Sequence, residues 1–277
     1  MNPLEKYNIK DESGIHYKSK ILNIAFTLRM EISPSDPDDR NNFKLDFRIN
    51  ELMSSLFNQW QFVIETYQRL HYLFTELNKY SNVLEPKKKI TDYDFYSLKH
   101  ELDFRDYSYL FIISLKTYLD MFACLIDIII NQQVRNEQNL PDLWNLGKKI
   151  DSVELNSEIN KLKDKTLYPW IFCIKETRDR LIHRGYLLKL NNRLKSENLI
   201  IQVFHGIDFS PHKELINIGD LFDSFMLDMP LIEEKISNIL IEEVELLKDR
   251  HIYEKTYSFG DLVNDFIYND KLKITPQ

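Results

Sequence analysis

Two turns of one predicted helix carry an unusual concentration of charge. The stretch Glu176–Tyr186, ETRDRLIHRGY, places Arg178, Arg180, His183 and Arg184 beside apolar positions. Charged side chains are rarely placed next to a core without a partner. A histidine can exchange a proton near neutral pH, and a guanidinium can bind a phosphate through several N–H groups. We therefore expect this stretch to form half of a phosphate-handling site, which a second copy of the chain completes.

The helical spacing of the motif decides which of its side chains can meet. Asp179 and His183 are four residues apart and share one face of a helix, so Asp179 can accept a hydrogen bond from the His183 ring and fix its tautomer. Arg178 lies five residues before His183, a divergence of about 140° on one helix. We therefore expect that one helix cannot aim both at a single phosphate, and that two copies about a two-fold axis can.

The charges of the chain are unevenly distributed. The formal net charge is −7, but residues 161–195 contain ten Lys or Arg residues and only three acidic ones. This segment therefore carries +7 and the remainder −14. The motif lies in the middle of the basic segment. A local basic patch can attract nucleic acid even when the whole chain is acidic, although a solvated charged face would have the same composition.

Glycine is scarce, with six residues in 277, and no glycine-rich phosphate-binding motif occurs. The hydrophobic content of 43% and the aromatic content of 13% indicate an ordered globular protein that can bury a sizeable core. The two cysteines, Cys124 and Cys173, lie in apolar runs without the spacing of metal ligands. We expect buried free thiols, no metal site and no cofactor.

The longest apolar run, Tyr109–Ile130, is interrupted by Lys116, Asp120 and Asp127. A membrane span would tolerate these charges poorly, so the run is predicted to be a core helix. The first residues, MNPLEKYNIKDESG, contain no apolar stretch typical of a secretory signal. We therefore expect a cytoplasmic protein without a membrane partner.

The N-terminal fifth of the chain alternates apolar and polar residues. Large apolar side chains occupy every second position over residues 22–32 and again over residues 43–49, with a polar loop between them. This period of two is typical of half-buried strands. We predict a two-stranded antiparallel hairpin that makes residues 1–49 an N-terminal extension.

Beyond residue 50, apolar residues recur every three or four positions, which indicates helices. Four long helices are expected at about 50–80, 96–134, 166–184 and 220–250, the last kinked by Pro230. Shorter elements are expected to be a helix over Pro141–Ile150, a helical piece over 157–165 and a second β-hairpin inserted at 186–204. The predicted fold is mainly α, an antiparallel four-helix bundle over residues 50–250 with a tail at 251–277, in a single domain overall.

The motif Arg178-Asp179-x-x-x-His183, near the end of the third long helix of such a bundle, resembles the R-x4–6-H signature of the HEPN superfamily. Members commonly carry Asn, Asp or His directly after the arginine, and Asp179 matches this pattern. The stretch SLKTYLDMFACLID resembles the second core helix of the family, in which a polar residue often approaches the motif. Asp120 is the candidate for that role.

The resemblance implies a metal-independent endoribonuclease that acts as a homodimer, as in toxin–antitoxin and phage-defence systems. His183 would take the proton from the RNA 2′-hydroxyl, and Arg178 would stabilise the charge on the phosphorane. The products would be a 2′,3′-cyclic phosphate and a 5′-hydroxyl. The basic residues around the motif would hold the RNA backbone: Lys175, Arg180, Arg184 and Lys189.

Two alternatives remain open at the level of sequence. The three motif residues also fit an ion-pair network at a helix end, where cations suit the helix dipole. The chain could also be a non-catalytic HEPN-like module that binds a nucleotide or a protein partner, with the acidic fourth helix as the interface. Some HEPN toxins carry a tyrosine two residues after the histidine, which an antitoxin modifies. Here Tyr186 comes three residues after His183, so regulation by an antitoxin is expected less strongly.

Overall fold

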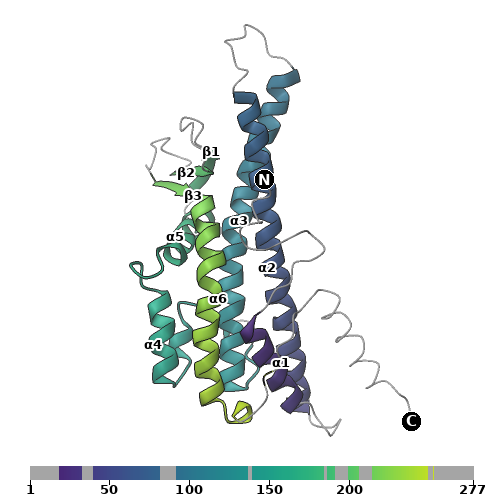
Figure 1. Cartoon of the computed structure of the whole chain (residues 1–277), viewed down its shortest axis with the longest axis vertical. Coiled ribbons are helices and arrows are strands. Elements are labelled where there is room, and N and C mark those ends of the chain that lie inside the picture. Colours follow the sequence, from purple (N-terminus) through teal and green to yellow (C-terminus); the bar gives the residue numbers. More distant parts are fainter. Residues whose placement is uncertain are drawn as a thin grey trace, which may run out of the picture. The chain divides into compact units, whose positions relative to one another are not determined.

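The computed structural model describes residues 19–32, 40–81, 92–136, 139–183, 186–190, 199–205, 214–248 and 252. This part of the chain is mainly helical, as predicted (Figure 1). Its α-helices are α1 (Lys20–Ile32), α2 (Arg40–Ser81), α3 (Asp92–Asn131), α4 (Val153–Leu162), α5 (Pro169–His183) and α6 (Ile218–Glu243). Its other elements are the 3-10 turns η3 (Leu146–Lys148) and η4 (Glu245–Leu247) and the strands β1 (Tyr186–Leu190), β2 (Ile200–His205) and β3 (Glu214–Asn217).

The predicted N-terminal hairpin is wrong, because residues 22–32 lie in α1 and residues 43–49 lie in α2. The alternating apolar residues do not share one buried face. Met30 is 53% exposed and Phe47 is 53% exposed, whereas Leu28 and Ile49 are buried. The buried positions of α1 recur every three or four residues, which is the period of a helix. Surplus apolar residues on the exposed side had produced an apparent period of two.

The chain folds into two compact units. The first unit contains residues 1–61, 117–168 and 227–277, and the second contains residues 62–116 and 169–226. The boundaries between them fall inside α2, α3 and α6 and not in linkers. The predicted boundary at residue 50 also falls inside α2. Whether the long helices form an up-and-down four-helix bundle stays a prediction.

In the first unit, α1 is held by buried polar contacts. Glu233 of α6 is 3% exposed, and its carboxylate accepts hydrogen bonds from Ser19 Oγ and from Tyr118 Oη, the latter at 2.7 Å. Arg29 of α1 donates to the Asp46 carboxylate of α2 at 2.7 Å. Buried polar groups of this kind are costly unless they are paired, so these contacts make the position of α1 specific.

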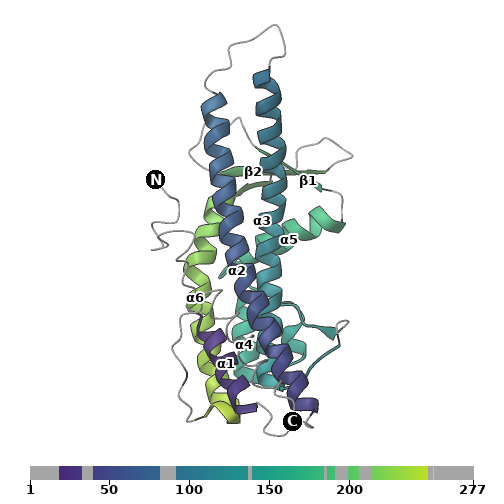
Figure 2. The same ribbon diagram turned by 90° about the vertical axis from the view of Figure 1, so that its right-hand side faces the viewer.

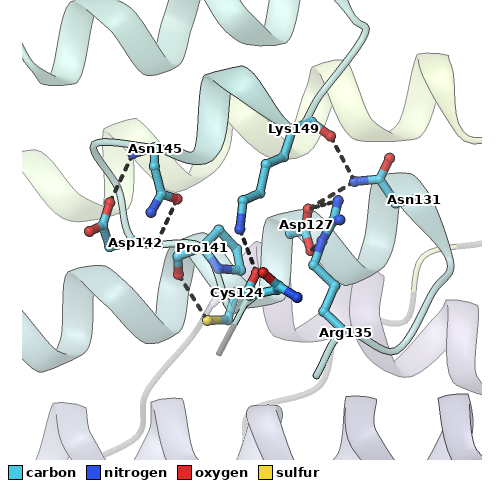
Figure 3. Close-up of polar contacts among 9 residues, drawn as sticks. Cys124, Asp127, Asn131, Arg135, Pro141, Asp142, Asn145 and Lys149 are labelled. Carbon is cyan, nitrogen blue, oxygen red and sulfur yellow. Dashed lines mark hydrogen bonds and ion pairs between the residues drawn. The ribbon is translucent and has the colours of Figure 1, made fainter. Parts of the chain in front are cut away.

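A second polar cluster of the first unit follows the end of α3 (Figure 3). The side chain of Asp127 is 4% exposed, and its two oxygens accept from Arg135 Nε at 2.6 Å and Arg135 Nη2 at 2.9 Å. Asn131 Nδ2 donates to Asp127 at 2.9 Å and to the Lys149 carbonyl at 3.3 Å. The cluster therefore ties the irregular chain after α3 back to the helix.

The helix predicted over Pro141–Ile150 is wrong, because this stretch forms a turn followed by the single 3-10 turn η3. The side chains of Asp142 and Asn145 each accept a hydrogen bond from the other residue's backbone N–H, at 2.8 and 3.0 Å (Figure 3). Such local bonds compete with helix formation. The following helix, α4, begins after Ser152, whose Oγ accepts from the Leu155 N–H at 3.0 Å.

The core of the second unit is aromatic. Tyr67 of α2 stacks on Phe222 of α6 with ring centroids 3.8 Å apart, and Phe111 of α3 lies 6.0 Å from Tyr67. Trp170 packs edge-on against Phe225 at 6.1 Å and so connects α5 to α6. Aromatic side chains bury large areas, and these contacts fix the helix that carries the motif.

The hairpin predicted after the third long helix is confirmed as β1 and β2, which pair antiparallel with Leu188 opposite Val203 (Figure 2). A third strand, β3, pairs antiparallel with β2 and was not predicted, because its four residues are too few to show a period. It leads directly into α6, where Asn217 Oδ1 accepts from the Gly219 N–H at 3.0 Å.

The described helices include none that pairs enough length with enough apolar character to cross a bilayer.

Candidate functional site

Helix α5 carries the motif and owes its place to one apolar face. Trp170, Ile174, Thr177 and Leu181, at intervals of three or four residues, are buried on that face. Pro169 is the first residue of the helix, a position where proline costs no hydrogen bond. The motif residues lie on the more exposed side. The predicted end at Arg184 and Gly185 lies outside the described residues.

Arg178 and His183 are in contact within one chain. Arg178 Nη1 lies 3.2 Å from His183 Nε2. The long arginine side chain therefore spans the angular divergence and meets the imidazole on the same helix. The prediction that only two copies of the chain aim both groups at a single phosphate stays a prediction. A guanidinium has no acceptor, so Nε2 must accept the hydrogen bond.

Asp179 does not make the contact predicted for it. Its carboxylate accepts hydrogen bonds from Arg178 Nη1 at 3.1 Å and Lys175 Nζ at 3.2 Å, and not from His183. Burial alone would raise the pKa of Asp179, but the hydrogen bonds and charges of Lys175 and Arg178 outweigh it and lower the pKa. Asp179 is therefore a carboxylate that holds the arginine and lysine in place.

The predicted basic flank is paired along the helix. Arg180 Nη2 lies 3.9 Å from Glu176 Oε2, and Lys175 Nζ lies 3.4 Å from Glu176 Oε1. Glu176 had not been predicted as part of the site. The spacing of four residues in the pairs Glu176–Arg180 and Lys175–Asp179 is the signal that could have revealed this network.

The remaining predicted residues are Arg184, Tyr186, Lys189 and Asp120. Arg184 lies outside the described residues. Tyr186 and Lys189 lie on β1, paired in register with His205 and Gln202, and only their backbone is described. Asp120 lies on α3 in the first unit, whereas the motif lies in the second. Its predicted approach to the motif stays a prediction.

The two cysteines are half-buried free thiols, not fully buried ones. Burial, followed by the charge of Asp120, raises the pKa of Cys124 to about 11. Burial also raises the pKa of Cys173. Within the described ranges, no group of three or more His, Cys, Asp or Glu side chains could hold a metal ion.

No protein-family model, curated protein or solved structure matches this chain. The likeness to the HEPN superfamily therefore rests on three residues and on their position in the last two turns of α5: Arg178, Asp179 and His183.

Among these residues, His183 is exposed, and the side chains of Arg178 and Asp179 are 32% and 31% exposed. An imidazole and a guanidinium thus lie in contact at an accessible helix end. This arrangement can accept a proton and bind an anion at the same place.

Proposed function

We propose that this chain is a metal-independent endoribonuclease of HEPN type that acts as a toxin or phage-defence effector. The contact between Arg178 Nη1 and His183 Nε2 is the observation that supports it best. The proposal includes an antiparallel HEPN-like bundle of the long helices. It also includes a homodimer, in which a second copy supplies a further Arg–His pair.

The donors of Arg178 support a phosphate-binding role. Its Nη1 carries two hydrogens, and the two contacts of this atom are with Asp179 and His183. Among the described residues, the Nε and Nη2 groups have no partner. Together these groups form the planar edge that binds two oxygens of a carboxylate or a phosphate. In the free protein, Asp179 and His183 occupy Nη1, and this edge remains available.

The proposed reaction starts at His183. When RNA binds, Arg178 turns from His183 to the phosphate and releases Nε2. This nitrogen then takes the proton of an RNA 2′-hydroxyl, and the resulting oxygen attacks the adjacent phosphorus. Arg178 stabilises the charge that develops on the phosphorane oxygens. The bond to the 5′-oxygen then breaks, and that oxygen takes up a proton from water, while the protonated His183 returns its proton to the solvent. The products are a 2′,3′-cyclic phosphate and a 5′-hydroxyl, and no step requires a metal ion.

The test is RNA cleavage in EDTA by the wild-type chain and by His183→Ala. We expect the wild type to cleave and the variant to lose activity by about a thousandfold, the usual range for a general base. His71→Ala is the matched control, because His71 is a half-buried histidine of the second unit outside the motif. Cleavage that persists in His183→Ala, or that EDTA abolishes, would refute the proposal.

The second candidate function is a non-catalytic module that binds a protein partner. The observation in its favour is the acidic surface of α6, where Glu234, Glu242 and Glu243 are exposed. Two results together would favour this candidate. The wild-type chain would cleave no RNA, and charge reversal on α6, but not His183→Ala, would abolish binding of a protein partner.

A further inference from the structure

Every described cation of the motif region already has a carboxylate partner on the same helix. Lys175 contacts Glu176 and Asp179, Arg178 contacts Asp179, and Arg180 contacts Glu176. Resting on the proposed function, we propose that Asp179 and Glu176 are built-in competitors of RNA phosphates. They neutralise the cations of α5 in the free protein and are displaced when RNA binds.

The position of Asp179 is that of a bridging anion. One of its oxygens accepts from Arg178 and the other from Lys175, at 3.1 and 3.2 Å. A phosphate that bridged the same two cations would use two oxygens in the same way, with charge-assisted hydrogen bonds. A phosphate can bind the Nη1 hydrogen of Arg178 that Asp179 occupies only by displacing this carboxylate, because each hydrogen serves one short bond.

The three side chains are also reachable. Their exposed fractions are 26% for Lys175, 32% for Arg178 and 31% for Asp179. An RNA strand can therefore meet these cations at the surface, without opening the core of the second unit.

Glu176 is the weaker competitor. Its oxygens lie 3.4 Å from Lys175 Nζ and 3.9 Å from Arg180 Nη2, longer than the contacts of Asp179. Coulomb attraction falls with distance, and the longer contact is beyond hydrogen-bond range. Because Lys175 serves both carboxylates, removal of one leaves this lysine with the other.

The size of the competition follows from exposure. Ion pairs between half-exposed side chains contribute little to stability, so RNA can displace them. The carboxylates then weaken RNA binding by a modest factor and do not prevent it. The effect is opposite in sign to that of a residue that binds RNA, whose removal weakens the complex.

The experiment measures the affinity for a mixed-sequence 2′-O-methyl oligoribonucleotide by fluorescence anisotropy at low salt. This probe lacks the reactive hydroxyl, so it stays intact with an active enzyme. We expect Asp179→Asn to tighten the Kd by about fivefold, the factor that corresponds to about 1 kcal/mol. Glu176→Gln should tighten it less. The double variant should gain less than the product of the two, because Lys175 is shared.

Glu158→Gln is the matched control. Glu158 pairs with Lys161 at a spacing of three residues on α4, so the substitution removes the same charge from another paired acid, just before the basic segment. We expect its Kd to change by less than about twofold, since long-range effects of one exposed charge are screened. Circular dichroism melting curves confirm that each variant is folded. Glu176→Gln decides the test if Asp179→Asn does not fold.

Three outcomes separate the inference from the function on which it rests. Tighter binding by Asp179→Asn and Glu176→Gln, but not by Glu158→Gln, supports the inference. Binding by the wild type that neither substitution tightens beyond the Glu158→Gln control refutes the inference and leaves the ribonuclease proposal standing. No binding by any variant, together with no cleavage of unmodified RNA, refutes both.

Discussion

The two units of the chain each contain an Asp–Arg pair, and the pairs differ in burial and geometry. In the first unit the Asp127 side chain is 4% exposed, and Arg135 contacts both of its oxygens at 2.6 and 2.9 Å (Figure 3). In the second unit the Asp179 side chain is 31% exposed, and Arg178 makes one contact with it at 3.1 Å. In the first pair, two N–H groups of Arg135 bond to the same carboxylate. In the second pair, Arg178 uses only Nη1 for Asp179, so its Nε and Nη2 groups are not directed at this carboxylate.

The difference shows that residue types alone do not indicate a role. A buried two-point pair uses its hydrogen-bonding capacity within the fold, so it holds the chain after α3 in place. A half-exposed one-point pair retains the Nε and Nη2 donors of Arg178 and places Nη1 against His183. Unsatisfied donors at an accessible position are what binding an anion requires.

Arg178→Ala should give the largest effect and should act on activity alone. Loss of a donor to the phosphorane lowers the cleavage rate by about a thousandfold. The free energy of unfolding should change by less than about 0.5 kcal/mol, because the pair is half-exposed. Gel-based cleavage and urea unfolding measure the two quantities.

The control for Arg178→Ala is Arg105→Ala. Arg105 is also an exposed arginine of the second unit that pairs with the aspartate next to it, Asp106, at 3.0 Å. It should leave both cleavage and stability unchanged. An equal loss of cleavage in both variants would remove Arg178 from the proposed site.

Arg135→Ala should show the reverse pattern. It leaves the buried Asp127 carboxylate with only Asn131 as a hydrogen-bond donor among the described residues. Removing one partner of a buried pair costs about 3 kcal/mol of unfolding free energy. Cleavage by the folded fraction should be unaffected. Urea unfolding measures this loss of unfolding free energy. If Arg135→Ala lost no more unfolding free energy than the control Arg105→Ala, the Arg135–Asp127 pair would not stabilise the fold.

The alkylation rates of Cys124 in the first unit and Cys173 in the second test the pKa expected for each thiol. The pKa of Cys124 is raised from 9.0 to about 11, so at pH 8 its thiolate fraction and alkylation rate should fall about a hundredfold below those of the unfolded chain. Cys173 should react faster, since a hydrogen bond from Thr177 and the charge of Arg180 partly offset the effect of burial on its pKa. Mass spectrometry after iodoacetamide pulses measures both rates.

The sign of the associated pH effect follows from the raised pKa of Cys124. The folded state holds the thiol proton more tightly than the unfolded state does. The stability that this contributes is present below pH 9.0 and is lost as the pH rises to about 11. Equal alkylation rates in the folded and unfolded chains would contradict the environment described for Cys124.

The smallest expected difference is in the unfolding free energies of two glycine-to-alanine variants, at Gly147 and Gly219. A Cβ at Gly147 would lie 2.8 Å from Asn156 Oδ1, and Asn156 is anchored by its bond to the Ile150 carbonyl at 2.7 Å. Gly147→Ala should therefore cost about 1 kcal/mol of unfolding free energy. At Gly219 the closest atom is 3.2 Å away, and alanine favours the helix, so Gly219→Ala should change stability by less than about 0.5 kcal/mol. Urea unfolding of both variants decides between them.

Several features could be predicted from local pattern. The long apolar periods predicted α3 and the start of α6 to within a few residues, although α6 ends at Glu243 and not near residue 250. The two apolar runs after the motif predicted β1 and β2. The motif residues were located at the end of α5 by their types and order alone. These features depend on neighbours a few positions away, which the sequence displays directly.

Other features depended on packing or on side-chain hydrogen bonds, which the apolar pattern does not display. Met30 and Phe47 supplied a false strand period, because the exposure of an apolar residue is decided by packing and not by its type. The turn at Asp142 and Asn145 replaced a predicted helix because side chains bonded to the backbone. The four residues of β3 became a strand only because β2 offers an edge for pairing.

The sequence by itself determined which groups are available: an arginine, an aspartate and a histidine in the last two turns of one helix, within a basic segment. Only the tertiary structure decided how they pair. Side-chain length and rotamer let Arg178 reach His183 across the helix, and Lys175 competes successfully for Asp179. Spacing specifies the directions of Cβ atoms, but hydrogen bonds form between side-chain ends, whose positions depend on every neighbour within reach.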